Sequence, residues 1–333
     1  MILGESKIIN MISLPDFKEK QILFIQAEHG VHNKIRFQND NLVFLKNDEV
    51  VNRASCHKIF AAFIIGDLTI TSGLLRDGLR HGVSFFFLKN NFDVYASVNA
   101  VAEGNYLLRM KQYSITPKDE LNIAKQIVGN KIRNQFFLLK LKANKKDKQK
   151  IVSKEKQSIS AINAAGNCET LMGLEGNVSK QFFTEYFNFI GWARRMPRIK
   201  PDIPNFLLDM GYTMLFNLID ALLRLHGFDT YRGIYHKLFF QRESLSCDII
   251  EPFRCVIDRE LLKMFNLKQI DTGDFSVEGG KYTVSFDKGQ KYAKIFMKAI
   301  MNRKEDIYKY VKGFYRHVMY NEKNLPPFYS MRK

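Results

Sequence analysis

The chain has 333 residues, which is more than one compact domain usually needs, so we expect two domains. Hydrophobic residues make up 46% of it and charged residues 26%, which supplies ample material for a globular core. Lys and Arg number 51 against 34 Asp and Glu, giving a formal net charge of +17. Such an excess attracts a polyanion, either nucleic acid or an anionic membrane, unless the lysines are merely solvated.

Three features of the sequence favour nucleic acid over a membrane. No apolar run approaches the roughly 20 residues that a membrane-spanning helix requires, and the longest, Ile59–Ile65, is predicted to be a buried strand. The first residues, MILGESKIIN, lack the charged-then-apolar layout of a secretory signal. The four cysteines are scattered without a C-x-x-C pair, as expected of reduced thiols. We therefore predict a cytoplasmic protein that binds nucleic acid.

Residues up to about 100 are rich in Ile, Val and Phe, which predicts β-structure. Strands are expected at 21–26, 34–45, 61–70 and 83–88. A short helix over 73–81, capped by Ser72, is expected to interrupt them. Asn90-Asn91 is expected to form a hairpin turn, because Asn tolerates a positive φ.

Beyond Gly104 the hydrophobic spacing becomes helical. The strongest helix is predicted over 119–141, with Pro117 before its start and lysines at its end. The lysine-rich stretch 142–156 is expected to be a flexible connection, with phosphate contact as the alternative. Further helices are expected at 175–190, 205–225, 246–264 and 291–319, with a two-stranded excursion over 268–286 that turns at Gly279-Gly280. The prediction is an α+β fold, with a small β-rich domain (1–102) followed by a larger all-α domain (103–333).

Glu175 stands at the head of an apolar stripe. On a helix that starts there, Val178 and Phe182 follow at three- and four-residue steps. A carboxylate in that position needs a partner, because its burial is costly. The partner is either the positive end of the helix dipole or a metal ion.

Asp248 and Glu251 are three residues apart, which places them on one face of a helix. Two close carboxylates repel each other unless a cation resolves the conflict. Arg254 would do so structurally, and a divalent metal would do so functionally. Pro252 removes a backbone donor, so a kink or a helix start is expected there.

His236 precedes this pair in the segment GIYHKLFF. Alone it is typical of a core histidine, but an imidazole with two or three carboxylates forms a mixed N/O site suited to Mg²⁺ or Mn²⁺. Such an ion polarises a phosphoryl oxygen and activates a nucleophile. Cationic side chains that suit a phosphate backbone flank the same region, namely Arg194, Arg195, Arg198, Lys200, Arg242, Arg254 and Arg259. The pattern indicates metal-dependent phosphoryl transfer on nucleic acid, and no phosphate-loop, dinucleotide-turn, HExxH or GxSxG motif offers another chemistry.

Four blocks of the sequence resemble CRISPR-associated protein one, the integrase/endonuclease family that inserts spacers into CRISPR arrays. They are GDLTITSGLLRDGLRHGVSFFFL, LMGLEGNVSKQFF, PDIPNFLLDMGYTMLFNLIDALLRLHGFDTYRGIYH and SLSCDIIEPFRCVIDR. The resemblance covers residues 40 to 290 approximately. It reproduces the family order of Glu, then His, then Asp-x-x-Glu together with the neighbouring residues.

The resemblance implies a catalytic set of Glu175, His236, Asp248 and Glu251. Of these, Glu175, His236 and Glu251 take the positions of metal ligands for Mg²⁺ or Mn²⁺, and Asp248 that of the acidic residue beside the site. It also implies DNA contacts at Lys180, Arg194, Arg195, Arg198, Tyr212, Arg242 and Arg254. Two departures are Lys180, where the family commonly has arginine, and the segment around Arg198, where a proline-richer stretch is usual.

The resemblance further implies a β-sandwich-like N-terminal domain that makes dimer and partner contacts, and a catalytic helical domain. The protein would form a homodimer, and two dimers would bridge through CRISPR-associated protein two, a small ferredoxin-like subunit, into a heterohexamer. The implied reaction joins the 3′-hydroxyl ends of short double-stranded DNA to the CRISPR repeat by transesterification. A hydrolytic nuclease of branched DNA and a non-catalytic DNA-binding scaffold remain alternatives.

Overall fold

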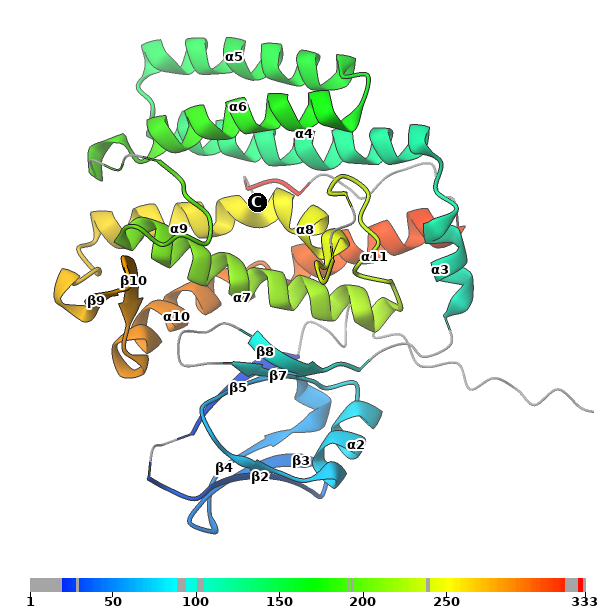
Figure 1. Cartoon of the computed structure of the whole chain (residues 1–333), viewed down its shortest axis with the longest axis vertical. Coiled ribbons are helices and arrows are strands. Elements are labelled where there is room, and N and C mark those ends of the chain that lie inside the picture. The colour runs from blue at the N-terminus through cyan, green and yellow to red at the C-terminus, as the bar shows by residue number, and fades with distance from the viewer. Residues whose placement is uncertain are drawn as a thin grey trace, which may run out of the picture.

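The computed structural model describes residues 20–27, 30–88, 94–100, 105–190, 192, 194–237, 240–320 and 329–331. Figure 1 shows a β-structured N-terminal part at one end and layers of helices stacked above it, ending in α5. This order confirms the predicted α+β class. The predicted boundary between residues 102 and 103 and the predicted Asn90-Asn91 turn lie outside the described residues.

The N-terminal part contains two four-stranded sheets. The first has the order β1 (Gln21–Gln26), β5 (Ile59–Ile65), β7 (Ser84–Leu88) and β8 (Val94–Val98). The second has the order β4 (Glu49–Ser55), β3 (Asn41–Lys46), β2 (Asn33–Gln38) and β6 (Thr69–Ile70). Apolar side chains from both sheets form one buried cluster, so the arrangement is sandwich-like, as expected.

Strand β5 joins this sandwich to the helices. All seven of its residues are buried, as the continuous apolar run predicts. Ala62 and Ile64 contribute to the cluster between the two sheets. Ala61, Phe63 and Ile65 contribute to the core that the helices share. The two faces of one strand thus belong to two cores.

The predicted strand over 34–45 is wrong, because two strands occupy it. β2 and β3 pair antiparallel around Asn39 and Asp40, whose φ angles are 48° and 55°. Asn and Asp tolerate this left-handed conformation, which suits a two-residue hairpin loop. β3 and β4 are joined in the same way through Asn47 and Asp48. The predicted strand over 61–70 is likewise divided between β5 and β6.

Helix α2 (Ser72–Arg80) matches the predicted short helix, but its N-cap is Thr71 and not Ser72. Thr71 Oγ1 accepts a 3.1 Å hydrogen bond from the backbone N–H of Leu74. This bond satisfies one of the amides that the first helical turn leaves unpaired.

The remaining helices are α3 (Tyr106–Tyr113), α4 (Pro117–Lys142), α5 (Lys145–Ala164), α6 (Cys168–Tyr186), α7 (Ile203–His226), α8 (Ser244–Ile250), α9 (Arg254–Asn266), α10 (Phe286–Met301) and α11 (Lys304–Tyr320). Short 3₁₀ turns are η1 (Cys56–Lys58), η2 (Asn188–Ile190), η3 (Glu251–Phe253) and η4 (Thr272–Asp274). The predicted hairpin is present as β9 (Phe275–Glu278) and β10 (Lys281–Val284), and both glycines of its turn have positive φ.

The expectation of a flexible connection over 142–156 is wrong. Asn144 caps α5 by accepting a 2.9 Å hydrogen bond from the backbone N–H of Asp147. Ile151 and Ile162 are buried on the face of α5 that packs on α4 and α6. The lysines therefore belong to the outer face of an amphipathic helix.

Two other helix boundaries differ from the prediction. Helix α6 begins at Cys168, capped by Asn167, so Glu175 lies inside the helix. This excludes the dipole of the helix N-terminus as the partner of Glu175. The single helix expected over 291–319 is two helices, α10 and α11, separated at Asn302 and Arg303.

Helix α7 packs against α8, α9, α10 and α11 and forms the centre of the helical core. The sequence led us to expect no segment apolar enough to cross a membrane. By length and hydropathy alone, α7 is long and apolar enough to do so. However, 83% of its most apolar 18-residue window is buried inside the protein, which is the environment of a core helix. A Cβ atom at Gly211 would lie 2.5 Å from Ile257 and 3.2 Å from Phe296, so the close approach of α9 and α10 requires this glycine.

Replacing Gly211 by Ala should lower the free energy of unfolding by about 1–3 kcal/mol, because the added methyl group overpacks the contact with α9. Urea unfolding measures this change. Gly173 of α6 is the matched control, since it is exposed and no atom lies within 4 Å of its ideal Cβ. Gly173→Ala should raise the free energy of unfolding by up to about 1 kcal/mol. Equal effects at both positions would contradict the packing argument.

Candidate metal and nucleic-acid site

Two carboxylates and one ammonium meet where α4, α6 and η3 pack together. Glu175 comes from α6, Glu251 from η3 and Lys131 from α4. Lys131 Nζ lies 2.6 Å from Glu251 Oε2 and donates a hydrogen bond to Glu175 Oε1. The exposed fractions of the three side chains are 10% for Lys131, 17% for Glu175 and 6% for Glu251. One ammonium therefore joins two of the predicted metal ligands.

The charges of Glu251 and Lys131 keep each other ionised. Burial acts to raise the pKa of Glu251, but the positive charges of Arg254 and Lys131 outweigh it and lower the pKa to about 2. Burial similarly favours the neutral amine of Lys131, yet the charges of Glu251 and Glu175 raise its pKa above the ordinary value. Near neutral pH Glu251 and Lys131 therefore form an ion pair.

Pro252 produces the predicted break in the helix over 246–264. Helix α8 ends at Ile250, η3 follows and α9 starts at Arg254, since a proline nitrogen cannot donate to the preceding turn. Asn134 of α4 donates a 2.9 Å hydrogen bond to the carbonyl of Pro252, which fixes the break against α4. Glu251 Oε1 accepts a 2.9 Å hydrogen bond from Arg254 Nε. Glu251 Oε2 is buried and, although Lys131 Nζ is close, receives no hydrogen bond from a described group.

Asp248 holds the loop that carries His236. Its Oδ2 accepts hydrogen bonds from the backbone N–H groups of Ile234 and Tyr235 at 2.6 and 3.0 Å. Its Oδ1 accepts one from the backbone N–H of His236 at 2.9 Å and lies 2.6 Å from His236 Nδ1. Both oxygens of this fully buried carboxylate are thus committed to the loop. The arrangement orients the imidazole by its Nδ1 edge and presents Nε2 for another ligand.

The structure brings Glu175 and Glu251 to one ammonium and ties His236 to Asp248. Within the described residues, no three His, Cys, Asp or Glu side chains are grouped closely enough to hold a metal ion. The donor set nevertheless fits a divalent cation in its chemistry. Two carboxylates and an imidazole are ligands that Mg²⁺ or Mn²⁺ accepts, and Glu251 Oε2 is a buried acceptor whose one cationic neighbour among the described residues is the ammonium of Lys131.

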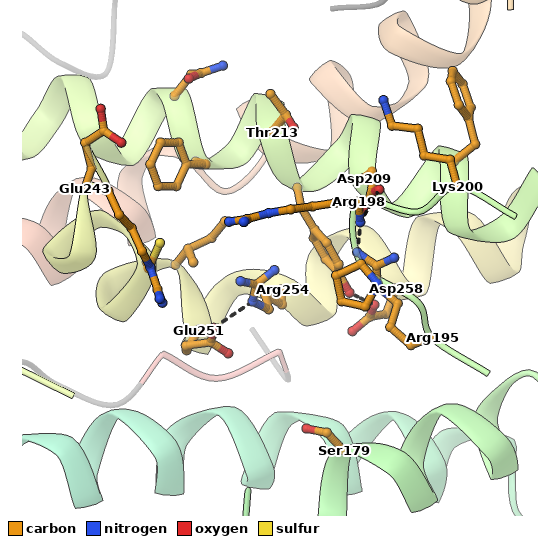
Figure 2. A pocket seen from close by; sticks show the side chains of 18 of the residues that line it. Ser179, Arg195, Arg198, Lys200, Asp209, Thr213, Glu243, Glu251, Arg254 and Asp258 are labelled. Carbon is orange, nitrogen blue, oxygen red and sulfur yellow. Dashed lines mark hydrogen bonds and ion pairs between the residues drawn. The ribbon is translucent and has the colours of Figure 1, made fainter. Parts of the chain in front are cut away.

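A cavity of about 1650 Å³ opens over Glu251 and Lys131. Figure 2 shows arginines directed into it from several segments, with Glu251 and Arg254 joined at one side. Every residue predicted to contact DNA lines this cavity, namely Lys180, Arg194, Arg195, Arg198, Tyr212, Arg242 and Arg254. Lys200 also lines it, whereas Arg259 is not among the lining residues. Glu175 and His236 are not among the lining residues, but Ser179, which is, donates a 2.7 Å hydrogen bond to Glu175 Oε1.

Part of this wall is braced internally. Two guanidinium groups lie near the ring of Tyr212, with Arg254 at 4.7 Å and Arg195 at 5.5 Å from the ring centroid. The Tyr212 hydroxyl donates to Asp258, and Arg195 forms an ion pair with Asp209. These side chains are therefore held by the protein itself.

Another part of the wall is available to a ligand. Lys180, Arg194 and Arg198 are exposed, and their side chains form no ion pair with another described residue. Sequence reasoning missed three further cations of the lining, Lys131, Arg224 and Lys281. Lys131 and Lys281 lie outside the four quoted sequence blocks, whereas Arg224 lies inside one of them and pairs with Asp220 four residues earlier.

The carboxyl of Asp258 is protonated more readily than an ordinary aspartate. Burial raises its pKa to about 6, against the opposing hydrogen bond from Tyr212 and the charges of Arg254 and Lys131. Because the folded pKa is above the value of about 4 in the unfolded chain, this group stabilises the fold below about pH 4. That contribution, roughly 3 kcal/mol, is lost as the pH rises through 6.

Asp258→Asn should remove this pH dependence. Urea unfolding of both proteins at pH 4.5 and pH 7 measures it, and the wild type should lose roughly 2 kcal/mol more than the variant between the two values. The remaining carboxylates contribute equally to both proteins and cancel. Parallel stability curves for the two proteins would show that Asp258 is ionised throughout this range.

The chain is similar to known proteins in both sequence and fold. The family model described as CRISPR associated protein Cas1 matches residues 29–298. A "CRISPR-associated endonuclease Cas1 1" of Thermodesulfovibrio yellowstonii is 27% identical over 303 residues, covering 86% of this chain and 94% of the relative. A chain of a "Cas6-RT-Cas1--Cas2 complex" matches with a TM-score of 0.76 and 25% identity, over 95% of this chain and 36% of the other.

The fold is also that of a "Casposase bound to integration product", with a TM-score of 0.77 and 16% identity over 94% of this chain and 95% of the other. The family match covers most of the sequence and includes every residue of the carboxylate, histidine and cavity clusters. The chain therefore belongs to the CRISPR-associated protein Cas1 family.

Proposed function

We propose that the protein is a metal-dependent DNA integrase/endonuclease of CRISPR adaptation. It would join the 3′-hydroxyl ends of short DNA fragments to the CRISPR repeat. The observation that carries this proposal is the pair Glu175 and Glu251, held by the ammonium of Lys131 beside an arginine-rich cavity that Lys131 and Glu251 help to line. The endonuclease names of the relatives and the integration product bound by the casposase support it.

Glu175, Glu251 and His236 would hold the metal, Mg²⁺ or Mn²⁺, because they supply the oxygen and nitrogen donors that these ions accept. When bound, the ion supplies Lewis-acid stabilisation of the charge that develops on the phosphate. Asp248 acts on His236 through Nδ1, keeping the ring in one orientation and one tautomer. Asp248 would therefore support the site by orienting His236, without binding the metal itself.

The cavity wall would bind the DNA backbone. Lys180, Arg194 and Arg198 are exposed and carry charges that phosphates would pair. The braced side chains Arg195 and Arg254 offer fixed charges beside the reacting phosphate, at no cost of ordering when DNA arrives. Tyr212 and Arg242 would complete the contact surface.

The proposed reaction exchanges one phosphodiester for another. The 3′-oxygen of the fragment forms a bond to a phosphorus of the repeat, and the bond from that phosphorus to the repeat's own 3′-oxygen breaks. The proton lost by the attacking hydroxyl is balanced by the one gained by the leaving oxygen. No net hydrolysis takes place, so the reaction needs no nucleotide cofactor.

The assembly belongs to the same proposal. We assign residues 1–102 to dimerisation and partner contacts and residues 103–333 to catalysis, metal and DNA. Two homodimers would join through a dimer of the small protein Cas2 into a heterohexamer, acting on double-stranded DNA in the cytoplasm. The complexes of related chains with Cas2 support this partner.

Replacing Glu175 or His236 by Ala should abolish strand joining, with a loss of at least 100-fold, while DNA binding persists. The measurement is a strand-joining assay with Cas2, Mg²⁺ or Mn²⁺ and labelled fragments, alongside a DNA-binding titration. Glu185→Gln is the matched control, because Glu185 is on the same helix but pairs with the exposed Lys154. Joining that survives either alanine change would overturn the site assignment.

The same assay separates the two other functions. A hydrolytic nuclease using the same site would yield shortened strands and no joined product. A non-catalytic scaffold would bind DNA with a steep salt dependence and would be indifferent to Mg²⁺ and Mn²⁺.

A further inference from the structure

The ammonium of Lys131 lies between Glu175 and Glu251, yet Lys131 belongs to none of the sequence motifs that indicated the site. We propose that Lys131 is a built-in counter-ion, which holds Glu175 and Glu251 in place before a divalent cation binds and which that cation must displace. Lys131 is then the residue that sets the affinity of the site. The inference rests on the metal site of the proposed function and adds a positioning residue to it.

The competition follows from the atoms involved. The ammonium of Lys131 contacts Glu175 Oε1 and lies 2.6 Å from Glu251 Oε2. A divalent cation held by the same two side chains would use these oxygens as well. An ammonium and a metal ion cannot both occupy the space between two carboxylates, because like charges a few ångströms apart repel strongly where water is scarce.

The net charge of the cluster also indicates that Lys131 opposes metal binding. Two carboxylates, Glu175 and Glu251, face two cations, Lys131 and Arg254. The cluster is therefore neutral as a whole and exerts little net attraction on an incoming divalent ion. Removing the ammonium leaves a net negative charge and frees the oxygens that bind metal.

The cavity offers space for the displaced ammonium of Lys131. Lys131 is among the residues that line the large cavity. Its four-carbon stem is flexible at the tip, so the charge can move from the carboxylates into the cavity while the backbone of α4 remains fixed. Displacement therefore needs no movement of a helix.

A purely structural role is the alternative, and helix α4 offers a control for it. Lys140 lies on the same helix and pairs with Glu155 at 2.7 Å, with both side chains 17% exposed. That pair joins α4 to α5 and lies apart from the carboxylate cluster. Lys140→Met thus removes a comparable half-buried ion pair without touching the metal ligands.

The test is the affinity of the full-length, DNA-free protein for Mn²⁺, measured from the electron paramagnetic resonance signal of the free ion. Lys131→Met should lower the melting temperature in chelator and yet tighten Mn²⁺ binding by roughly 5- to 150-fold, the usual size of a coupling between two ligands. Lys131→Arg keeps the charge and should not tighten binding. Lys140→Met should lower the melting temperature and leave Mn²⁺ affinity unchanged.

Mn²⁺ binding by Lys131→Met that is equal to or weaker than that of the wild type overturns the inference, while metal binding by the wild type upholds the site itself. Absence of Mn²⁺ binding in the wild type and in all three lysine variants instead overturns the metal site of the proposed function. If Lys131→Met does not fold, lysine acylation of the wild type followed by mass spectrometry decides the matter. Mg²⁺ should increase the labelling of Lys131 relative to Lys140, and unchanged labelling overturns the inference.

Discussion

The ammonium of Lys131 lies between the carboxylates of Glu175 and Glu251, and packing contacts of helix α4 hold it in that position. Burying charged groups is costly, so such a cluster persists only where the geometry is good and the surroundings are rigid. Helix α4 supplies this rigidity, because Asn134 bonds both the Pro252 carbonyl of η3 and the carbonyl of Tyr329 near the end of the chain. The break in the chain at Pro252 and the C-terminal segment are thus both fixed to the helix that carries the ammonium.

The break in the helix at Pro252 explains why Asp248 and Glu251, three residues apart, have different roles. On an uninterrupted helix they would share a face and repel each other. The turn at Pro252 directs Glu251 toward α4, while Asp248 faces the loop of His236 and accepts its backbone amides. In the Asp-x-x-Glu motif, Asp248 therefore holds the loop of His236, and Glu251 faces the ammonium of Lys131.

Sequence reasoning predicted the α+β class, the hairpin at Gly279-Gly280 and the cavity wall, because these depend on local periodicity, turn chemistry or family motifs. It missed helix α5, since abundant lysines masked the sparse apolar positions Ile151 and Ile162. It missed Lys131 for a different reason: one partner, Glu175, is 44 residues away in the chain. Only the packing of α4 on α6 and η3 brings these charges together, and no local pattern encodes that contact.

In the proposed function His236 and the two glutamates form one metal site. The most direct measurement is pulsed electron paramagnetic resonance of bound Mn²⁺ in protein labelled with ¹⁵N-histidine. A single shared site should give hyperfine coupling to one imidazole nitrogen, which His236→Ala abolishes, and should lose the bound ion when Glu175 and Glu251 are both replaced by Gln. Bound Mn²⁺ that shows no nitrogen coupling, or coupling that survives His236→Ala, would show that His236 is not a ligand of this ion.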